Sequence, residues 1–300
     1  MRLTLEALAV LETIDRQGSF AAAAEELHRV PSAITYAVQK LEQDLDVLIF
    51  DRRGHRALLT ETGRELLREG RHVLQAAAEL ESRVKRVATG YEVELRVAVD
   101  DVIPMERLYP LFHRFYEEDC GTRLRILLEV YGGAWDALAS GRADLVIGAP
   151  GEGPTGGGYS TRPLGTVQWL FAVAPTHPLA SVTEPIPPDE ILKHRSVAAA
   201  DSSRNLPPRT SGLLSGQDVL TVPDMRHKIA LQRIGIGVGY VPVHMVRADL
   251  EAGQLVAKQV LESKPGMPLL VAWRTGNKGK ALVWFLDQLE DRKLLASLLA

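Results

Sequence analysis

The sequence is poor in features that cross-link a chain or place it in a membrane. Cys120 is the only cysteine among 300 residues, so no intrachain disulfide can form, and this suits a reducing cytoplasm. No apolar run approaches the roughly 20 residues that span a bilayer, and the N-terminal residues show amphipathic helical spacing instead of an export signal. With 46% hydrophobic and 24% charged residues, the chain is predicted to be a cytoplasmic, globular protein of two or three domains without membrane contact.

Patterns typical of catalysis or metal binding are also missing. The eight histidines show no metal-ligand spacing with one another or with Cys120, and no GxSxG elbow occurs. The glycines of residues 235–239 lack GxGxxG spacing, and their alternation with Ile and Val is typical of a buried strand. The three glycines 156–158 are not followed by Lys-Ser or Lys-Thr, which indicates a loop. We expect no enzyme activity, no cofactor and no metal ion.

Negative charges slightly outnumber positive charges overall, but positive charge is concentrated locally. The formal net charge is -3 at pH 7, which argues against indiscriminate binding to polyanions. Residues 52–71 nevertheless carry six arginines and only three glutamates. This segment is therefore a candidate for contact with nucleic-acid phosphates.

Helical patterns joined by short breaks precede this segment. Helices are predicted to run to Arg16 from the N-cap Thr4, over residues 20–28 from the N-cap Ser19, and over residues 31–44. Pro31 suits the first position of the third helix because its fixed φ matches a helix and its missing N–H would have no partner. The last two helices and the break between them predict a helix-turn-helix.

The outward side of the third helix carries side chains that can read DNA. Apolar residues at helical spacing form its inward face, which leaves outward Ser32, Thr35, Tyr36, Gln39 and Lys40. Gln39 can form paired hydrogen bonds with adenine, and Thr35 can contact a thymine methyl group. The alternative is an ordinary solvated helix face, but the position on the second helix of a helix-turn-helix favours DNA contact.

A strand, a tight turn and a second strand are predicted over residues 48–59. The turn holds four side chains that can carry positive charge, Arg52, Arg53, His55 and Arg56. Such a cluster at a hairpin tip rarely serves a core, so contact with phosphates or the minor groove is favoured over a plain solvated turn. Residues 1–59 are thus predicted to form a winged helix-turn-helix DNA-binding domain.

The chain resembles the LysR-type transcriptional regulators, closely from Leu3 to about Val87 and more loosely beyond. The specific marks are Gly18-Ser19-Phe20, Ala23-Ala24, Leu27-His28, Leu41-Glu42, Leu48, Phe50-Asp51-Arg52 and Leu59-Thr60-Glu61-Thr62-Gly63. Family members commonly have Gln, Ser and Arg or Lys where this chain has Pro31, Thr35 and Tyr36, so base preference cannot be carried across. The family also usually has Gly at position 46, where Asp46 can adopt the left-handed conformation that the turn needs.

A long helix is predicted from Thr60 to about Ala88. Apolar or small residues recur in it at alternating spacings of four and three: Leu66, Gly70, Val73, Ala77, Leu80, Val84 and Val87. This heptad seam favours a dimer over a helix buried in one domain, with Gly70 and Ala77 letting two helices come close. Residues 60–90 are therefore predicted to dimerise the protein on an inverted-repeat DNA site. The resemblance implies a homotetramer of paired dimers, and RNA polymerase is a candidate further partner.

Short apolar strands alternate with helices from residue 91 onward, which predicts parallel sheets. The resemblance implies a periplasmic-binding-protein-like effector domain over residues 91–300, with the effector between two lobes. Crossovers are expected near Arg162-Pro163 and Ser263-Pro265, which gives lobe 1 as 91–162 and 266–300 and lobe 2 as 163–265. The whole fold is predicted to be α/β: an N-terminal all-α winged helix-turn-helix with a long linker helix, then a C-terminal two-lobed α/β effector domain.

Open parallel sheets bind ligands beyond the carboxyl ends of their strands. This rule selects Asp100, Asp101, Gly132, Gly133, Ala149, Pro150, Ser202, Ser203, Arg204, Asp224 and Met225. Two carboxylates would repel an anion, so Asp100 and Asp101 favour a cationic, zwitterionic or polyhydroxy effector. The alternative is that one Asp caps the following helix and the other is solvated. Arg204 could pair with one of them or hold an anionic part of the ligand.

Two functions remain. The favoured one is a LysR-type DNA-binding regulator whose promoter binding is modulated by a small-molecule effector. The other is a small-molecule-binding or metabolic α/β protein that uses its N-terminal helices for assembly only. Preference for promoter DNA over random duplex at moderate salt separates the two.

Overall fold

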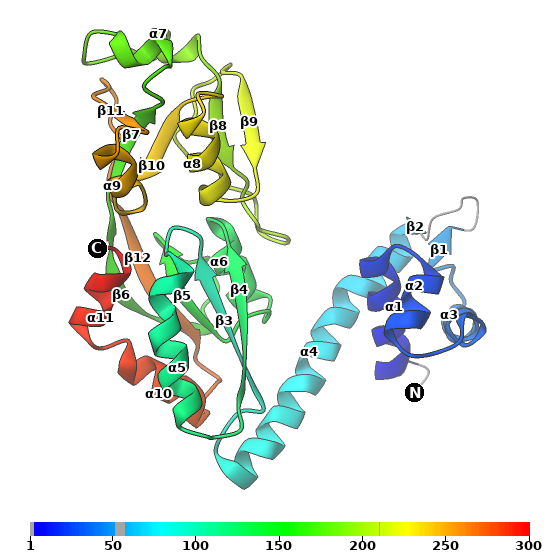
Figure 1. Cartoon of the computed structure of the whole chain (residues 1–300). Helices are drawn as coiled ribbons and strands as arrows, with labels where there is room; N and C mark the ends of the chain where they lie inside the picture. The colour runs from blue at the N-terminus through cyan, green and yellow to red at the C-terminus, as the bar shows by residue number, and fades with distance from the viewer. Residues whose placement is uncertain (1–2, 52–57, 210) are drawn as a thin grey trace. The chain divides into compact units, whose positions relative to one another are not determined.

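The computed structural model describes residues 3–51, 58–209 and 211–300. The chain divides into two compact units, residues 1–88 and 89–300 (Figure 1). Within the described residues, no helix is long and apolar enough to cross a membrane.

The first unit is a helical domain with a small two-stranded sheet. Its elements are α1 (Leu5–Gln17), α2 (Phe20–Glu26), α3 (Pro31–Leu45), β1 (Phe50–Asp51), β2 (Leu58–Leu59) and α4 (Glu61–Thr89). The predicted N-caps are confirmed, since the side chains of Thr4 and Ser19 accept hydrogen bonds from the N–H groups of Ala7 and Ala22, each at 3.1 Å. As predicted, Asp46 ends α3 in the left-handed conformation, with φ 57°.

The N-terminal part of α4 packs on the domain that precedes it. Leu67 is buried in the same cluster as Ile34, and Leu66 packs against this cluster. Gly70 is also buried, and a Cβ there would lie 2.7 Å from Leu8 Cδ2. The sequence predicts that Gly70 lets two copies of the helix approach; in the structure its missing side chain makes room for α1 of the same chain.

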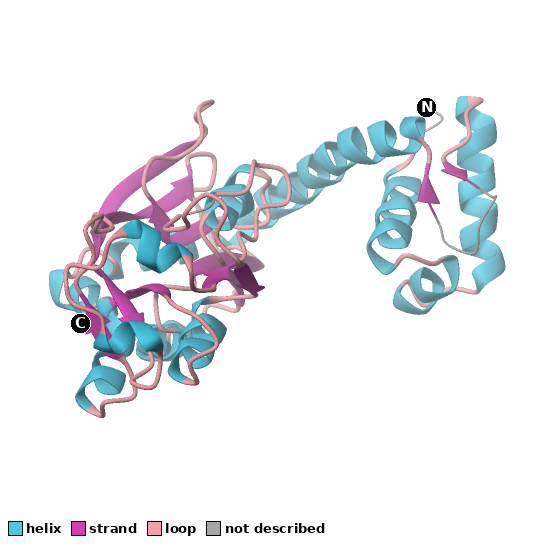
Figure 2. Ribbon diagram, turned by 90° about the horizontal axis from the view of Figure 1, so that it is seen from above, coloured by secondary structure: helices cyan, strands magenta, loops and turns pink. Residues whose placement is uncertain are grey.

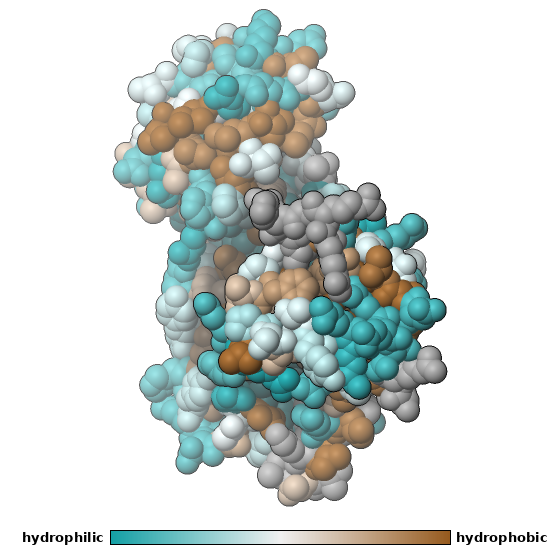
Figure 3. Space-filling view, turned by 90° about the vertical axis from the view of Figure 1, so that its right-hand side faces the viewer, coloured by the Kyte–Doolittle hydropathy of each residue, from teal (hydrophilic) through white to brown (hydrophobic). Residues whose placement is uncertain are grey.

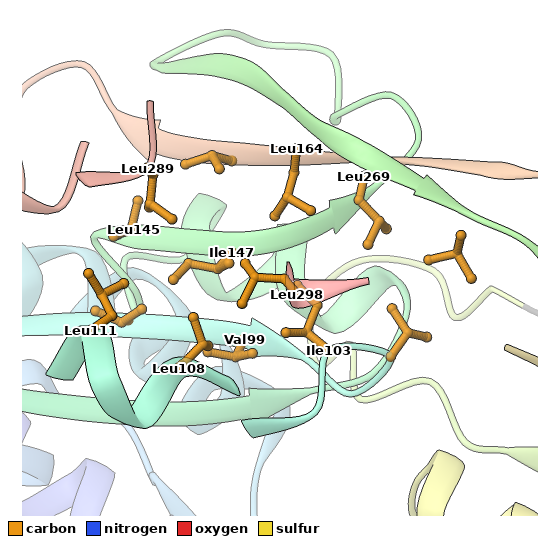
Figure 4. Close-up of a cluster of buried hydrophobic side chains, with 14 of the residues drawn as sticks. Val99, Ile103, Leu108, Leu111, Leu145, Ile147, Leu164, Leu269, Leu289 and Leu298 are labelled. Atoms are coloured by element: carbon orange, nitrogen blue, oxygen red, sulfur yellow. The ribbon is translucent and has the colours of Figure 1, made fainter. Parts of the chain in front are cut away.

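The second unit contains two lobes, and lobe 1 is built on a five-stranded sheet. Its elements are β3 (Glu94–Asp100), the 3-10 helix η1 (Met105–Leu108), α5 (Tyr109–Glu117), β4 (Arg123–Glu129), α6 (Gly132–Ala139), β5 (Leu145–Pro150), β6 (Tyr159–Val167), β12 (Met267–Arg274), α10 (Lys280–Gln288) and α11 (Arg292–Leu298). The strand order is β4-β3-β5-β12-β6, with β3 parallel to β4 and β5, as predicted, and β12 antiparallel to its neighbours. Figure 2 shows helices and strands packed together in the second unit as a whole. Figure 4 shows the buried core of lobe 1, with Val99, Ile147 and Leu108 among its members.

Lobe 2 is smaller and mixed in strand direction. Its elements are β7 (Trp169–Val173), the 3-10 helix η2 (Pro178–Ser181), α7 (Pro188–Leu192), β8 (Ser196–Ala199), β9 (Val219–Val222), α8 (Met225–Arg233), β10 (Gly239–Pro242), α9 (Val243–Glu251) and β11 (Val256–Lys258). β7 pairs antiparallel with β10 and β11, β8 pairs parallel with β9, and a bridge from Ser196 to Val238 connects the two sheets. Hydrophobic residues gather on the face of this lobe seen in the upper part of Figure 3.

The first crossover between the lobes lies later than the sequence predicts. β6 pairs with β12 from Tyr159 opposite Arg274 to Val167 opposite Met267, so the chain passes through Arg162 and Pro163 inside the lobe 1 sheet. It leaves that sheet only at residue 168, because the antiparallel ladder with β12 holds β6 along its full length. The return to lobe 1 lies between β11 and β12, where Ser263 to Pro265 are found.

Candidate functional site

α3 turns one apolar side to the domain core and one polar side to solvent. Ile34, Val38 and Leu41 are buried. The residues predicted to face outward are all exposed: Ser32, Thr35, Tyr36, Gln39 and Lys40. Tyr36 is 65% exposed, so most of its ring is open to a partner. The Thr35 hydroxyl donates to the carbonyl oxygen of Pro31 at 3.0 Å, which leaves it partly engaged within the helix.

Glu42, on the inward side of α3, fixes this helix to the wing. Its side chain is buried and accepts hydrogen bonds from the backbone N–H groups of Ile49 at 2.8 Å and Phe50 at 3.3 Å. Sequence reasoning missed this role, and a glutamate beside the inward Leu41 is the signal that could have revealed it. The predicted wing-tip residues Arg52, Arg53, His55 and Arg56 lie outside the described residues.

The seam residues of α4 change environment along the helix. Leu66 and Gly70 face their own domain, and Ala77 is half-buried. Farther along, Val73, Leu80 and Val84 are 45%, 55% and 63% exposed. The outer part of the seam is therefore an apolar strip with little cover from the chain that carries it.

The candidate ligand-site residues lie at strand ends of both lobes, and several of them meet. Asp101 Oδ2, just after β3, accepts a hydrogen bond from the N–H of Met225 at 2.6 Å. The N–H of Gly132, after β4, donates to Asp201 Oδ2 of lobe 2 at 3.0 Å. Asp101 therefore does cap a helix, but the helix is α8 of the other lobe and not η1, which follows it in the sequence.

The segment after β8 is fastened to lobe 1 through Ser202. The Ser202 hydroxyl donates to the Glu129 carboxylate and accepts from the N–H of Val130 at 2.8 Å. A Cβ on Gly133 would lie 1.8 Å from Ser202 Oγ, so only glycine permits this approach. Gly133 and Ser202, both predicted to line the ligand site, lie where the two lobes join.

A buried ion-pair network supports the same contact. Arg142 pairs with Glu129 and, at 2.9 Å, with Asp136, and these carboxylate residues are 4% and 1% exposed. Asp136 Oδ1 also accepts from the N–H groups of Asn205 at 2.8 Å and Leu206 at 2.9 Å. Burial opposes ionisation of Asp136, but these hydrogen bonds, first that from Arg142, lower its pKa below the ordinary value. The ionised carboxylate of Asp136 therefore helps to hold the segment.

Three other predicted site residues have structural roles or face solvent. Ala149 is fully buried in the lobe 1 cluster that contains Trp135, so it offers no surface to a ligand. Asp224 caps α8 by accepting from the N–H of His227 at 2.9 Å, and it pairs with the ring of His227 at 2.8 Å. Arg204 is exposed, and among the described residues its side chain forms no ion pair with either Asp100 or Asp101.

Sequence reasoning missed four residues that connect to the aspartate pair. Tyr131 and Lys228 interact electrostatically with the pair, and Lys264 lies near Lys228, Tyr131 and Trp169. With Asp100 and Asp101 we call these residues the interlobe cluster. Lys228 is 5% exposed and lies one helical turn after Asp224. The Lys264 Nζ lies 3.5 Å from the ring centre of Trp169 and 5.9 Å from that of Tyr131. The sequence holds a signal for each lysine. Lys228 follows the strand-end residue Asp224 at helical spacing, and Lys264 lies within the predicted crossover Ser263-Pro265.

Burial moves the protonation equilibria of the interlobe cluster toward neutral forms. It raises the pKa of Asp100 well above the ordinary value, assisted by the charge of Asp101, and raises the pKa of Asp101 to about 7. It lowers the pKa of Lys228 to about 7 and that of Lys264 to about 8, with repulsion between the lysines adding to the effect at Lys228. Asp100 Oδ2 has no hydrogen-bond partner within the part of the chain that the structure describes. The cluster can thus present ammonium groups and a neutral carboxyl group.

A helix-turn-helix with an exposed polar helix, a wing and a separate two-lobed α/β unit defines a DNA-binding regulator with a ligand-binding domain. Residues 5–64 match the bacterial regulatory helix-turn-helix protein of the lysR family, and residues 88–293 match the LysR substrate binding domain. The chain belongs to the LysR family of transcriptional regulators, as its resemblance to that family predicts.

Individual proteins agree with this assignment. YeeY of Escherichia coli K12, named an uncharacterized HTH-type transcriptional regulator, is 38% identical over 300 residues, which is 100% of this chain and 97% of that protein. YhaJ of the same strain, named a probable HTH-type transcriptional regulator, is 39% identical over 287 residues, 96% of each chain. The crystal structure of full-length CbnR with its target DNA has a TM-score of 0.58 at 18% identity, over 97% of this chain and 100% of that one, which concerns the fold alone. The chain is a regulator and not an enzyme.

Proposed function

We propose that residues 1–59 bind promoter DNA by laying α3 in the major groove. The observation that carries this proposal is the exposed row of hydroxyl, aromatic, amide and ammonium groups on α3: Ser32, Thr35, Tyr36, Gln39 and Lys40. The hydrogen bonds of Glu42 support it, because a reading helix must keep a fixed register against its wing. Arg52, Arg53, His55 and Arg56 of the wing then contact phosphates or the minor groove.

Residues 60–90 join two copies of the chain through the exposed part of the α4 seam. Val73, Leu80 and Val84 support this role, because an apolar strip at heptad spacing is stabilised by a second helix. A two-fold dimer presents two α3 helices to an inverted repeat, and pairs of dimers form a homotetramer. The assembly acts in the cytoplasm, with RNA polymerase as a further partner.

Residues 91–300 bind a small-molecule effector between the lobes, and the effector alters DNA binding. Support comes from the contact of strand ends across the lobes and from the buried, charged interlobe cluster. An effector can act in this way only when it binds the two arrangements of the lobes unequally. Asp101 is the residue through which it would act most directly, because its carboxylate caps α8 across the interface.

Substitution of single α3 residues tests the DNA interface. Gln39→Ala and Tyr36→Ala are each expected to reduce discrimination between the protein's own promoter and random duplex by about 1–3 kcal/mol, the value of a good base contact. Lys40→Ala should instead weaken binding to both DNAs and lower the slope of log K against log salt by about 1, because one phosphate contact is lost. Fluorescence anisotropy titrations at several salt concentrations measure both quantities.

A glutamine far from this interface serves as the control. Gln254→Ala, exposed on lobe 2, should leave both titrations unchanged. If the Tyr36, Gln39 and Lys40 variants all lost as much affinity for promoter DNA as for random DNA, Tyr36 and Gln39 would not be base-reading residues. Absence of any promoter preference in the unaltered protein would remove the regulatory proposal itself.

A further inference from the structure

A cavity in lobe 2 adjoins the interlobe cluster. It has a volume of about 260 Å³ and shares Lys264 with that cluster. Its lining is mainly apolar, with Phe171, Ile191, Leu214 and Tyr240 among its members. Since roughly 150 Å³ is enough to hold a benzene ring, the cavity has room for a small apolar group.

Three polar side chains converge on Gly239 beside this cavity. A Cβ on Gly239 would lie 3.2 Å from Lys228 Nζ, 3.3 Å from Gln232 Nε2 and 3.5 Å from Ser196 Oγ. Ser196 also lines the cavity, and its hydroxyl makes only a long hydrogen bond of 3.4 Å to the carbonyl oxygen of Val238. The three groups therefore point at a place next to the cavity where the chain itself contributes no side chain.

These groups are buried without the partners that burial normally requires. Gln232 is fully buried, and neither its amide nitrogen nor its amide oxygen has a hydrogen-bond partner among the described residues. Lys228 is 5% exposed, yet none of the ion pairs found within residues 3–51, 58–209 and 211–300 includes it. The indole N–H of Trp169, beneath Lys264, is likewise buried and unpaired within those residues. Such a group of unpaired donors is costly unless a ligand completes it.

We propose that the effector is a small anion whose carboxylate or phosphate oxygens lie between Lys228 and Lys264, with an apolar part in the adjoining cavity. The proposal rests on the effector function proposed above and names the chemical class of that effector. Ammonium groups, the amide of Gln232 and the hydroxyl of Ser196 supply donors for anionic oxygens, and Gly239 leaves them room. An apolar ring or short chain fits the lining near Phe171 and Tyr240.

The aspartate pair does not oppose an anion as strongly as the sequence suggests. That expectation depends on two ionised carboxylates, whereas burial favours the protonated form of Asp100, which can donate a hydrogen bond. An anion also favours the protonated lysines, whose pKa values without it are about 7 for Lys228 and about 8 for Lys264. Binding should therefore take up protons, and affinity should fall as pH rises through these values.

Matched pairs of charged and neutral probes test the proposal on the full-length protein. The pairs are benzoate with benzamide, and phenyl phosphate with phenol, each measured by thermal shift and by calorimetry at pH 6 to 9. We expect the anion of at least one pair to raise the melting temperature while its neutral partner does not, and which pair responds separates carboxylate from phosphate. Lys228→Met and Lys264→Met should each weaken that binding at least tenfold, and Gly239→Ala should weaken it by filling the space.

Controls keep this test separate from folding and from the proposed regulatory function. Lys193→Met, an exposed lysine of the same lobe, should bind the anion as the unaltered protein does. Circular dichroism and promoter affinity of each variant report a folding defect. Equal binding of neutral and charged probes, unchanged binding by Lys228→Met, or no response to any of the four probes would overturn the proposal. Promoter preference is measured without any probe. A failure of the anion proposal would therefore not contradict the proposed DNA-binding function.

Discussion

Replacing Leu80 and Val84 of α4 by glutamate is expected to convert the proposed dimer to monomers and to lower promoter affinity by about 10²–10⁴-fold. Both residues are more than half exposed in the single chain, at 55% and 63%, so the substitutions should not disturb its own fold. In a paired seam each glutamate would bring an unpaired charge into an apolar contact. A monomer binds only one half-site. It therefore loses the high effective concentration that a dimer gives its second α3 helix once the first is bound. Sedimentation velocity and anisotropy titration measure the two effects.

The matched control for this prediction lies on the far side of the same helix. Ala78 is exposed and sits roughly 140° around α4 from Val73 at 3.6 residues per turn. Ala78→Glu should therefore remain dimeric with unchanged affinity. If the double glutamate variant stayed dimeric and bound promoter DNA with unchanged affinity, the exposed part of the seam would have no role in assembly.

Much of the fold can be predicted from the sequence because its signals are local. Thr4, Ser19 and Asp46 act within one helical turn of their own positions, and the structure confirms the role of each. The first crossover could not be located in this way. β6 continues to Val167 because it pairs with β12, which lies about a hundred residues farther along the chain, and no local pattern near Arg162 reports that pairing.

The same distinction separates the two candidate sites. The outward face of α3 follows from helical periodicity, so the sequence alone is enough to identify its five residues. The interlobe cluster depends on contacts between distant segments, such as that of Asp101 with Met225, 124 positions apart. Lys228 and Lys264 resemble ordinary surface lysines in the sequence, but the fold buries Lys228 and half-buries Lys264. Gly133 and Ser202 are found by the strand-end rule, but their mutual contact occupies them.

Arg142→Met is expected to lower the free energy of unfolding of the second unit by about 3–5 kcal/mol, because it leaves Glu129 and Asp136 buried and uncompensated. Methionine keeps much of the volume, so the loss reports charge more than packing. The segment carrying Ser202 should also become more mobile. Glu129 accepts a hydrogen bond from the Ser202 hydroxyl, and Asp136 accepts one from the N–H of Asn205. Chemical denaturation measures the stability, and amide hydrogen exchange of residues 201–206 measures the loosening.

The pH dependence of this loss distinguishes charge from simple damage to the core. The pKa of Asp136 is lowered in the folded protein, so its contribution to stability is present above its ordinary value and is lost as pH falls through the lowered one. Without Arg142 the buried carboxylate of Asp136 would take up a proton more readily, and the stability deficit of the variant should shrink between pH 7 and pH 4. Arg195→Met is the control, since its pair with Asp218 is exposed at 48% and 64%, and the expected change is about 0–1 kcal/mol. A deficit of Arg142→Met that stayed constant with pH would show that the arginine stabilises the lobes by packing and not through the carboxylates it pairs with.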